Sequence, residues 1–254
     1  SMYENYPFWH TLLSECGFDV VLSPESTYSM YRKGVGCVMS DNICFPAKVV
    51  HGHILALKEM GVDRIFYPMV IKEGKEFENT SNTFNCPVVS GYPDVIQSSM
   101  NPKEQYGISL DKPVVTFSDE KALRKACFNY VSSFGVTQAD FNQAFHLAIQ
   151  EQNQTEYQLK AMQEKVLSES LHHNKLVFIL ACRPYHADPL IHHKAGQVLS
   201  DLGVNVLTED VFRDSHLTNF SNLNMVSQWS YPNRVTQAAM EVAALPQNVQ
   251  LVQL

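Results

Sequence analysis

The sequence lacks the features of a chain that crosses or enters a membrane. No apolar stretch reaches the ~18–20 residues that a bilayer-spanning helix needs. The first ten residues, SMYENYPFWH, have neither the basic segment nor the apolar core of a signal peptide. The net charge is −7 and no basic run is present, which argues against nucleic acid or an anionic membrane as a partner.

Cysteine is scarce, and its spacing excludes the common cysteine-rich sites. Six cysteines in 254 residues are too few for the disulfide framework of a small secreted domain. No two of them form a CxxC pair, so neither a zinc ribbon nor a thioredoxin-type site is indicated. We therefore expect a cytoplasmic protein in a reducing setting, with some thiols available for a metal.

The glycine-rich nucleotide loops are also missing. The chain contains no GxxxxGK[ST] loop and no GxGxxG fingerprint, so ATP or NAD binding by these routes has no support. A GxSxG nucleophile elbow is absent as well.

What the sequence does contain is an alternation of short apolar runs with helical patterns, which predicts an α/β fold. Continuously apolar strands separated by helices are typical of a parallel sheet covered on both faces. Residues 1–117 are therefore predicted to form a first Rossmann-like half. Its predicted strands are 18–23, 34–39, 64–70, 86–92 and 113–117.

The rest of the chain predicts a helical connector and a second Rossmann-like half. Residues 118–173 are helical and polar, with Thr137 as the N-cap of one long helix. Residues 174–254 alternate again, with strands in 175–185, 204–209 and 249–254 and helices over 190–202 and 233–244. Because the chain stops at the last strand, we expect this half to be truncated at its C-terminal end.

Cys44 and Cys86 are the candidate metal ligands. Pro46 suits the first turn of a helix that ends at Gly61, so Cys44 lies just before a helix N-terminus, where free N–H groups favour a thiolate. Cys86 ends the long segment that leaves the strand at 64–70. Two thiols in loops at one edge of a parallel sheet can share a soft metal or an iron–sulfur cluster. The alternative is two unrelated packing thiols.

The loop RPYHADP places Arg183, Tyr185 and His186 after a predicted strand. Such a loop can bind an anionic ligand, or it can be a proline-rich turn whose arginine pairs with Glu209 or Asp210. His51 and His53 point in roughly opposite directions on one helix, so they cannot chelate one ion together.

Seven motifs in this order resemble a known family. They are YPFW (6–9), VVLS (20–23), SDNICFPAKVVHGH (40–53), GVDRIFYP (61–68), NCPVVSGYPDVI (85–96), RPYHADP (183–189) and LTEDVF (207–212). Together they resemble the dehydratase-like region, an activase-related domain of unknown function, in the activators of 2-hydroxyacyl-CoA dehydratases. The resemblance covers nearly the whole chain.

The resemblance implies an iron–sulfur protein of anaerobic metabolism. Related proteins hold a cluster, such as a 4Fe–4S cluster, between paired Rossmann-like halves through three cysteines. Cys44 and Cys86 match the first two ligand positions, and the third is expected in a loop after the final strand, beyond Leu254. The family usually has glycine where this chain has Cys182, which we interpret as an incidental thiol.

The resemblance also implies a function and partners. An ATPase activase module, which binds the ATP and lies outside this chain, would drive low-potential electron transfer to the cluster. An acyl-CoA substrate and a second dehydratase-like subunit are further expected partners. The alternative is a non-catalytic scaffold or docking domain that retains the fold, and neither hypothesis is decided by the sequence.

Overall fold

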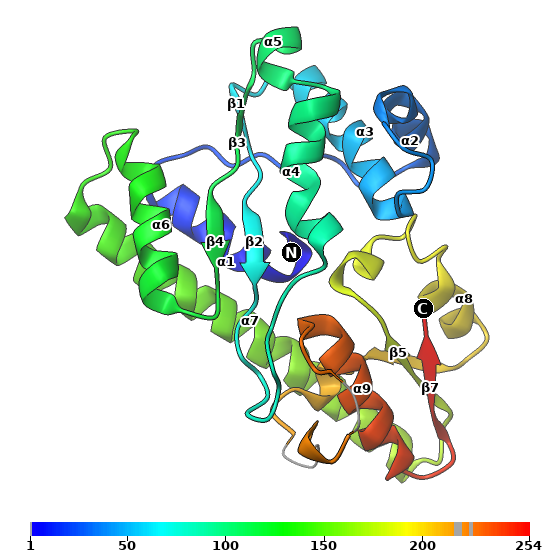
Figure 1. The fold of residues 1–254 in the computed structure, drawn as a ribbon. Coiled ribbons are helices and arrows are strands. Elements are labelled where there is room, and N and C mark those ends of the chain that lie inside the picture. The colour runs from blue at the N-terminus through cyan, green and yellow to red at the C-terminus, as the bar shows by residue number, and fades with distance from the viewer. Residues whose placement is uncertain (1, 216–219, 224–225) are drawn as a thin grey trace.

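The structure is a computed structural model that describes residues 2–215, 220–223 and 226–254 (Figure 1). It mixes helices with three small parallel sheets. The α/β class predicted from the sequence is therefore confirmed, while the arrangement into two Rossmann-like halves stays a prediction.

The first part of the chain surrounds a narrow parallel ribbon of strands. β1 pairs with β3, and β2 pairs with β4. Pro68 and Pro113 interrupt the two ladders, because proline has no N–H to donate. The amide of Tyr67 still reaches Asp111 O at 2.7 Å, and that of Met69 reaches Pro113 O at 2.9 Å. The elements are α1 (Met2–Glu15), α2 (Tyr28–Gly34), the 3-10 turn η1 (Val35–Cys37), α3 (Phe45–Glu59), β1 (Arg64–Phe66), β2 (Met69–Lys72), α4 (Pro87–Ser99), α5 (Pro102–Tyr106), β3 (Ser109–Asp111) and β4 (Val114–Thr116).

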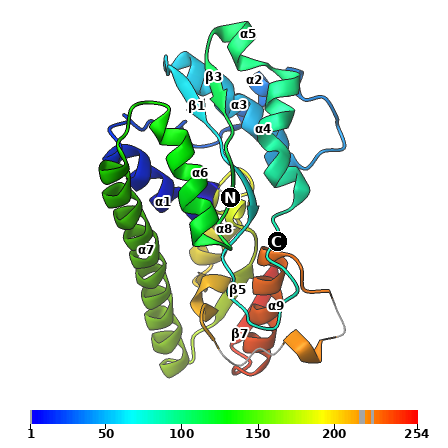
Figure 2. The same cartoon turned by 60° about the vertical axis from the view of Figure 1, so that its left-hand side comes forward.

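Two capped helices follow. Asp119 caps α6 (Glu120–Ser132), and Thr137 caps α7 (Gln138–His172) by accepting from the amide of Asp140. α7 is the long helix predicted from the sequence, and it runs along the side of the molecule against α1 (Figure 2). Phe8 of α1 and Phe141 and Phe145 of α7 are fully buried in the core between these helices.

The last part of the chain forms a three-stranded parallel sheet in the order β6-β5-β7. Its core contains Val177, Ile179, Leu207, Ala238 and Val249. The elements are β5 (Val177–Ala181), the 3-10 turn η2 (Pro184–Ala187), α8 (Ala195–Asp201), β6 (Asn205–Thr208), the 3-10 turns η3 (Glu209–Phe212) and η4 (Phe220–Asn222), α9 (Ser230–Ala243) and β7 (Val249–Gln253).

Three of the five strands predicted in residues 1–117 are wrong. Residues 18–23 have no regular structure, and Val21 and Leu22 are exposed rather than buried. The run 34–39 begins with the last residue of α2 and continues as η1. The run 86–92 belongs to α4, because Cys86 caps that helix and Pro87 occupies its first turn.

The fold brings the loop after β5 up to the N-termini of α3 and α4 (Figure 1). This loop contains η2, which shares one cavity with Pro46 of α3 and another with Pro87 of α4. The candidate site lies where these three segments meet.

Candidate functional site

Cys44 is the N-cap residue of α3. Its backbone is extended, with φ −60° and ψ 150°, and its carbonyl accepts from the amide of Ala47 at 3.0 Å. The thiol makes no capping hydrogen bond and is exposed to solvent. Cys44 is therefore not a filler of the apolar core, and it stands at a helix N-terminus, where the helix dipole favours negative charge.

Cys86 occupies the same position on α4. It is the N-cap residue, Pro87 follows it in the first turn, and its carbonyl accepts from the amide of Ser90 at 3.0 Å. Its thiol also makes no capping hydrogen bond, and the residue is half-buried. The sequence signal for both positions is a cysteine followed within two residues by a proline.

Tyr185 of η2 lies within electrostatic reach of both thiols. Burial raises the pKa of Tyr185, the nearby Arg183 opposes that rise, and the thiols of Cys44 and Cys86 add to it. Tyr185 lines one cavity together with Cys86 and a second cavity together with Tyr92, which neighbours the Cys44 thiol.

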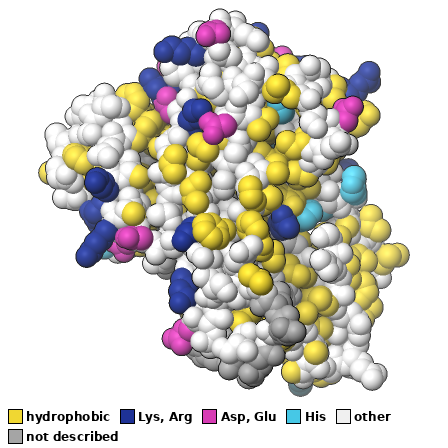
Figure 3. Space-filling model, in the orientation of Figure 1, with side chains coloured by type: hydrophobic (Ala, Val, Ile, Leu, Met, Phe, Trp, Pro, Cys, Tyr) yellow, Lys and Arg dark blue, Asp and Glu magenta, His cyan; other side chains and the backbone are white. Residues whose placement is uncertain are grey.

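Cys86, Arg183 and Tyr185 line one cavity of about 220 Å³. Its other walls are mostly aromatic or proline side chains, namely Phe84, Pro87, Pro184, Trp229, Tyr231 and Pro232. Hydrophobic side chains gather over the middle of this face of the molecule, between α4 and α9 (Figure 3). The guanidinium of Arg183 is the positively charged group among the described residues that line this cavity.

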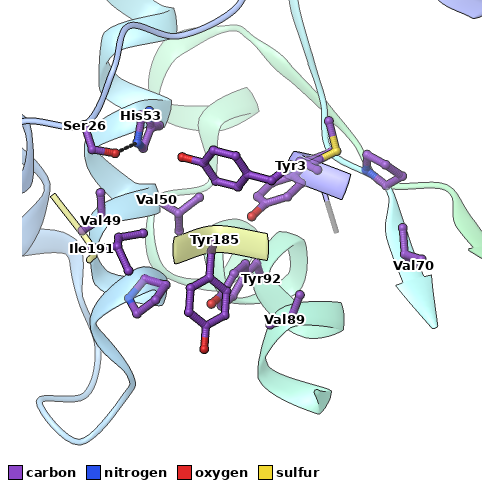
Figure 4. A pocket seen from close by; sticks show the side chains of 14 residues that line it. Tyr3, Ser26, Val49, Val50, His53, Val70, Val89, Tyr92, Tyr185 and Ile191 are labelled. Carbon is purple, nitrogen blue, oxygen red and sulfur yellow. Dashed lines mark hydrogen bonds between the residues drawn. The ribbon is translucent and has the colours of Figure 1, made fainter. Parts of the chain in front are cut away.

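Tyr185 also lines a second cavity, of about 100 Å³, together with residues of α3 and α4 (Figure 4). Tyr92 lines it, and its hydroxyl lies 3.8 Å from Cys44 Sγ. Burial raises the pKa of Tyr92, and the Cys44 thiol raises it further. Val50 and His53 of α3 line the same cavity.

His186 and Arg183 form a local turn. The amide of Arg183 donates to His186 Nδ1 at 3.0 Å. The His186 ring packs against the Tyr185 ring, with 4.6 Å between the ring centroids. Burial lowers the pKa of His186. The ring is therefore used within its own loop, and its binding to a ligand stays a prediction.

The proposed carboxylate partners of Arg183 bind other groups. Glu209 accepts from the amide of Cys182 at 3.3 Å, and Asp210 lies 2.7 Å from Arg213 Nε. In the part of the chain that the structure describes, no ion pair to Arg183 is found. The neighbour of the Arg183 side chain is Tyr185, whose pKa burial raises and Arg183 lowers.

The remaining thiols lie elsewhere. Cys182 is buried, its Sγ lies 3.7 Å from Glu209 Oε2, and burial raises the pKa of the thiol. Cys127 is in the α1–α7 core, and Cys16 and Cys37 pack partly against buried residues. Within residues 2–215, 220–223 and 226–254, no three His, Cys, Asp or Glu side chains are grouped to hold a metal ion.

The structure adds polar residues that the sequence did not reveal. Tyr3, Ser23, Ser26 and Asp188 form a hydrogen-bonded chain with His53. His51, on the other side of α3, is buried and bonded to Ala47 O at 3.0 Å and Ser99 Oγ at 3.2 Å. No local sequence motif predicts this hydrogen-bonded network, because its residues come from four distant segments.

Comparison with known proteins gives one family. The model described as the CoA enzyme activase uncharacterised domain matches residues 1–212. No curated protein and no solved structure matches the chain. Among the described helices, none is both long and apolar enough to cross a bilayer.

Proposed function

Because the chain belongs to the family of the CoA enzyme activase uncharacterised domain, we propose that it is an iron–sulfur domain of a 2-hydroxyacyl-CoA dehydratase activator. The domain would receive low-potential electrons under the control of an ATPase activase module. That module, in the same protein or in a partner, would bind the ATP. The observation that carries the proposal is the place of Tyr185 between two cavities. Cys86 lines one of them, and Tyr92, whose hydroxyl lies 3.8 Å from Cys44 Sγ, lines the other.

The donor set fits a cluster as two of its ligands. Both residues are free cysteines, both thiols are accessible in part, and each sits at a helix N-terminus without a capping hydrogen bond. Cysteine thiolates are the usual ligands of iron–sulfur clusters, which supply one-electron chemistry when bound. The amides of the two helix ends would stabilise the negative charge there. The third ligand is proposed to follow β7.

The neighbouring cavity suggests where an anionic ligand would bind. Arg183 provides a charged group next to Cys86, and Tyr185 provides a hydroxyl in the same wall. A guanidinium binds carboxylate or phosphate oxygens through paired hydrogen bonds. We propose an acyl-CoA as this ligand, with His186 holding the shape of the loop.

The proposed organisation has three parts. Residues 1–117 and 174–254 would be two Rossmann-like halves, and residues 118–173 the helical connector. A site between the halves leaves one side open to a second dehydratase-like subunit or to the activase module.

The alternative function is a non-catalytic scaffold that docks the activase module and needs no metal ligands. Iron binding by the two cysteines separates the two functions.

The test is anaerobic reconstitution with ferrous iron and sulfide, on this chain and on a version continued beyond Leu254. The longer version is expected to take up iron and sulfide and to show broad sulfur-to-iron charge-transfer absorption. Cys44→Ser or Cys86→Ser should abolish it, whereas Cys16→Ser, which changes a thiol outside the site, should not. Equal iron uptake by all three variants would favour the scaffold.

A further inference from the structure

Asp188 is a buried carboxylate with a complete set of partners. It is only 3% exposed. Its Oδ1 accepts from the amides of Leu190 at 2.9 Å and Ile191 at 3.2 Å. Its Oδ2 accepts from the hydroxyls of Tyr3, at 2.8 Å, and Ser26. Burial alone would raise the pKa of Asp188, but these hydrogen bonds lower it, so the group is ionised.

The direction of each hydrogen bond follows from the charge of Asp188. An ionised carboxylate only accepts, so Ser26 gives its single proton to Asp188. Ser26 Oγ must then accept from His53 Nε2, which lies 2.9 Å away (Figure 4). In neutral His53 the other nitrogen, Nδ1, accepts from the hydroxyl of Ser23 at 2.8 Å. The network thus assigns the tautomer of His53.

This direction excludes a serine-hydrolase triad, although serine, histidine and aspartate are in contact. In a triad the serine gives its proton to histidine, which makes the serine oxygen a nucleophile. Here the proton of Ser26 points at Asp188 and the histidine donates to the serine. The chain of hydrogen bonds is therefore a tether between segments.

The tether joins the site loop, which belongs to the last part of the chain, to the first part of the molecule. Asp188 directly follows η2, the turn that includes Tyr185. Tyr3 belongs to α1, and His53 belongs to α3, the helix that Cys44 caps. The bonds span 185 residues to Tyr3 and 162 residues to Ser26.

We infer that Asp188 is a positioning residue that holds η2 against the two cysteine-bearing helix ends. It fixes Tyr185 between Cys44 and Cys86 and closes the wall that Arg183 and Tyr185 give to the cavity beside Cys86. The inference rests on the proposed function only in treating these thiols as a ligand site.

The test removes the tether and leaves the local turn. In the double variant Tyr3→Phe, Ser26→Ala, Asp188 keeps its bonds to Leu190 and Ile191 but loses both links to the first part. The double variant loses two hydrogen bonds to a charged group, so opening of the loop should become about a hundredfold more frequent. Hydrogen exchange of the amides in residues 186–192 measures it.

A second readout follows the site itself in the metal-free chain. Alkylation of half-buried Cys86 should become several-fold faster relative to that of Cys16, a thiol outside the site. Ser26→Ala alone should give a smaller effect in the same direction. Ser23→Ala removes only the hydrogen bond between Ser23 and His53 and should have no effect.

Two results would overturn the inference. One is unchanged exchange in residues 186–192 together with unchanged Cys86 reactivity. The other is faster exchange spread evenly over the whole chain, which would make the tether a general stabilising contact. Since no metal is used, neither result depends on whether the chain binds a cluster.

Discussion

Glu209 is a buried carboxyl group at the start of η3, directly after β6. It is 6% exposed and accepts from the amide of Cys182. Burial, and then the charge of Asp210, raise the pKa of Glu209 to about 7. A buried charge without a cation costs free energy, so the group keeps its proton in the folded chain where it would lose it in the unfolded chain.

We predict that Glu209 makes stability depend on pH. Below the ordinary pKa of 4.5 the group is protonated in both states and contributes no difference. Between 4.5 and about 7 only the unfolded chain ionises, so the free energy of unfolding falls as pH rises, and above about 7 the loss is complete. At about 1.4 kcal/mol per pKa unit, the loss is about 3 kcal/mol.

The measurement is chemical denaturation of the wild type and of Glu209→Gln between about pH 4 and pH 8. The amide side chain of this variant cannot ionise, so the difference between the two proteins should grow across that range in favour of the variant. Glu104→Gln, a change of an exposed carboxylate, is the control and should show no such trend. The prediction would be contradicted if the free energies of unfolding of the wild type and Glu209→Gln differed by the same amount at every pH.

At the scale of elements, α2 and α3 approach each other through two glycines. A Cβ at Gly34 would lie well inside 3.0 Å of the backbone of Gly52, and a Cβ at Gly52 would lie as close to the carbonyl of Met30. Backbone atoms cannot move aside as a flexible side chain can. The motif HGH therefore includes a glycine because two helices cross there, between the histidines.

We predict that Gly52→Ala separates α2 from α3. The free energy of unfolding should fall by about 1–3 kcal/mol or more, which is typical of overpacking in a close contact. Gly91→Ala is the matched control, because it changes a glycine of α4 whose Cβ would meet no atom within 4 Å. That variant should be unchanged or more stable by up to ~1 kcal/mol from helix propensity. Equal free energies of unfolding for both variants would show that α2 adjusts freely.

The helices were more predictable from the sequence than the strands. The helix after Cys44 and the long helix after Thr137 were predicted from their spacing, proline and N-cap, and α3 and α7 confirm them. The strand at 86–92 was wrong because Val88 and Val89 favour a strand locally, while the Cys86–Pro87 start favours a helix.

The same limit applies to the site. Cys44, Cys86 and Arg183 could be proposed from the sequence because each lies at the end of an element with a recognisable motif, and their binding roles stay predictions. Ser26 and Tyr3 were not, because their partner Asp188 is 162 and 185 residues away. A contact of that range depends on how the whole chain packs, and no local pattern encodes it.

At the scale of the whole molecule, a buried ion cluster joins the first and last parts of the chain. Arg234 of α9 is 5% exposed and pairs with Glu4 of α1 at 2.6 Å and with Glu76. Arg213 pairs with Glu4 as well, and its Nε lies 2.7 Å from Asp210. Burial alone would lower the pKa of Arg234, but the charges of Glu4 and Glu76 raise it well above its ordinary value.

We predict that Arg234→Met costs about 3 kcal/mol or more of unfolding free energy, because it leaves two carboxylates short of a cation in a buried place. Lys33→Met is the control. It breaks the ion pair between Lys33 and Glu59, whose side chains are 55% and 57% exposed, and should cost under ~1 kcal/mol. Denaturation at neutral pH measures both. If Arg234→Met cost no more than the control, desolvation of the buried charges would already cancel their attraction.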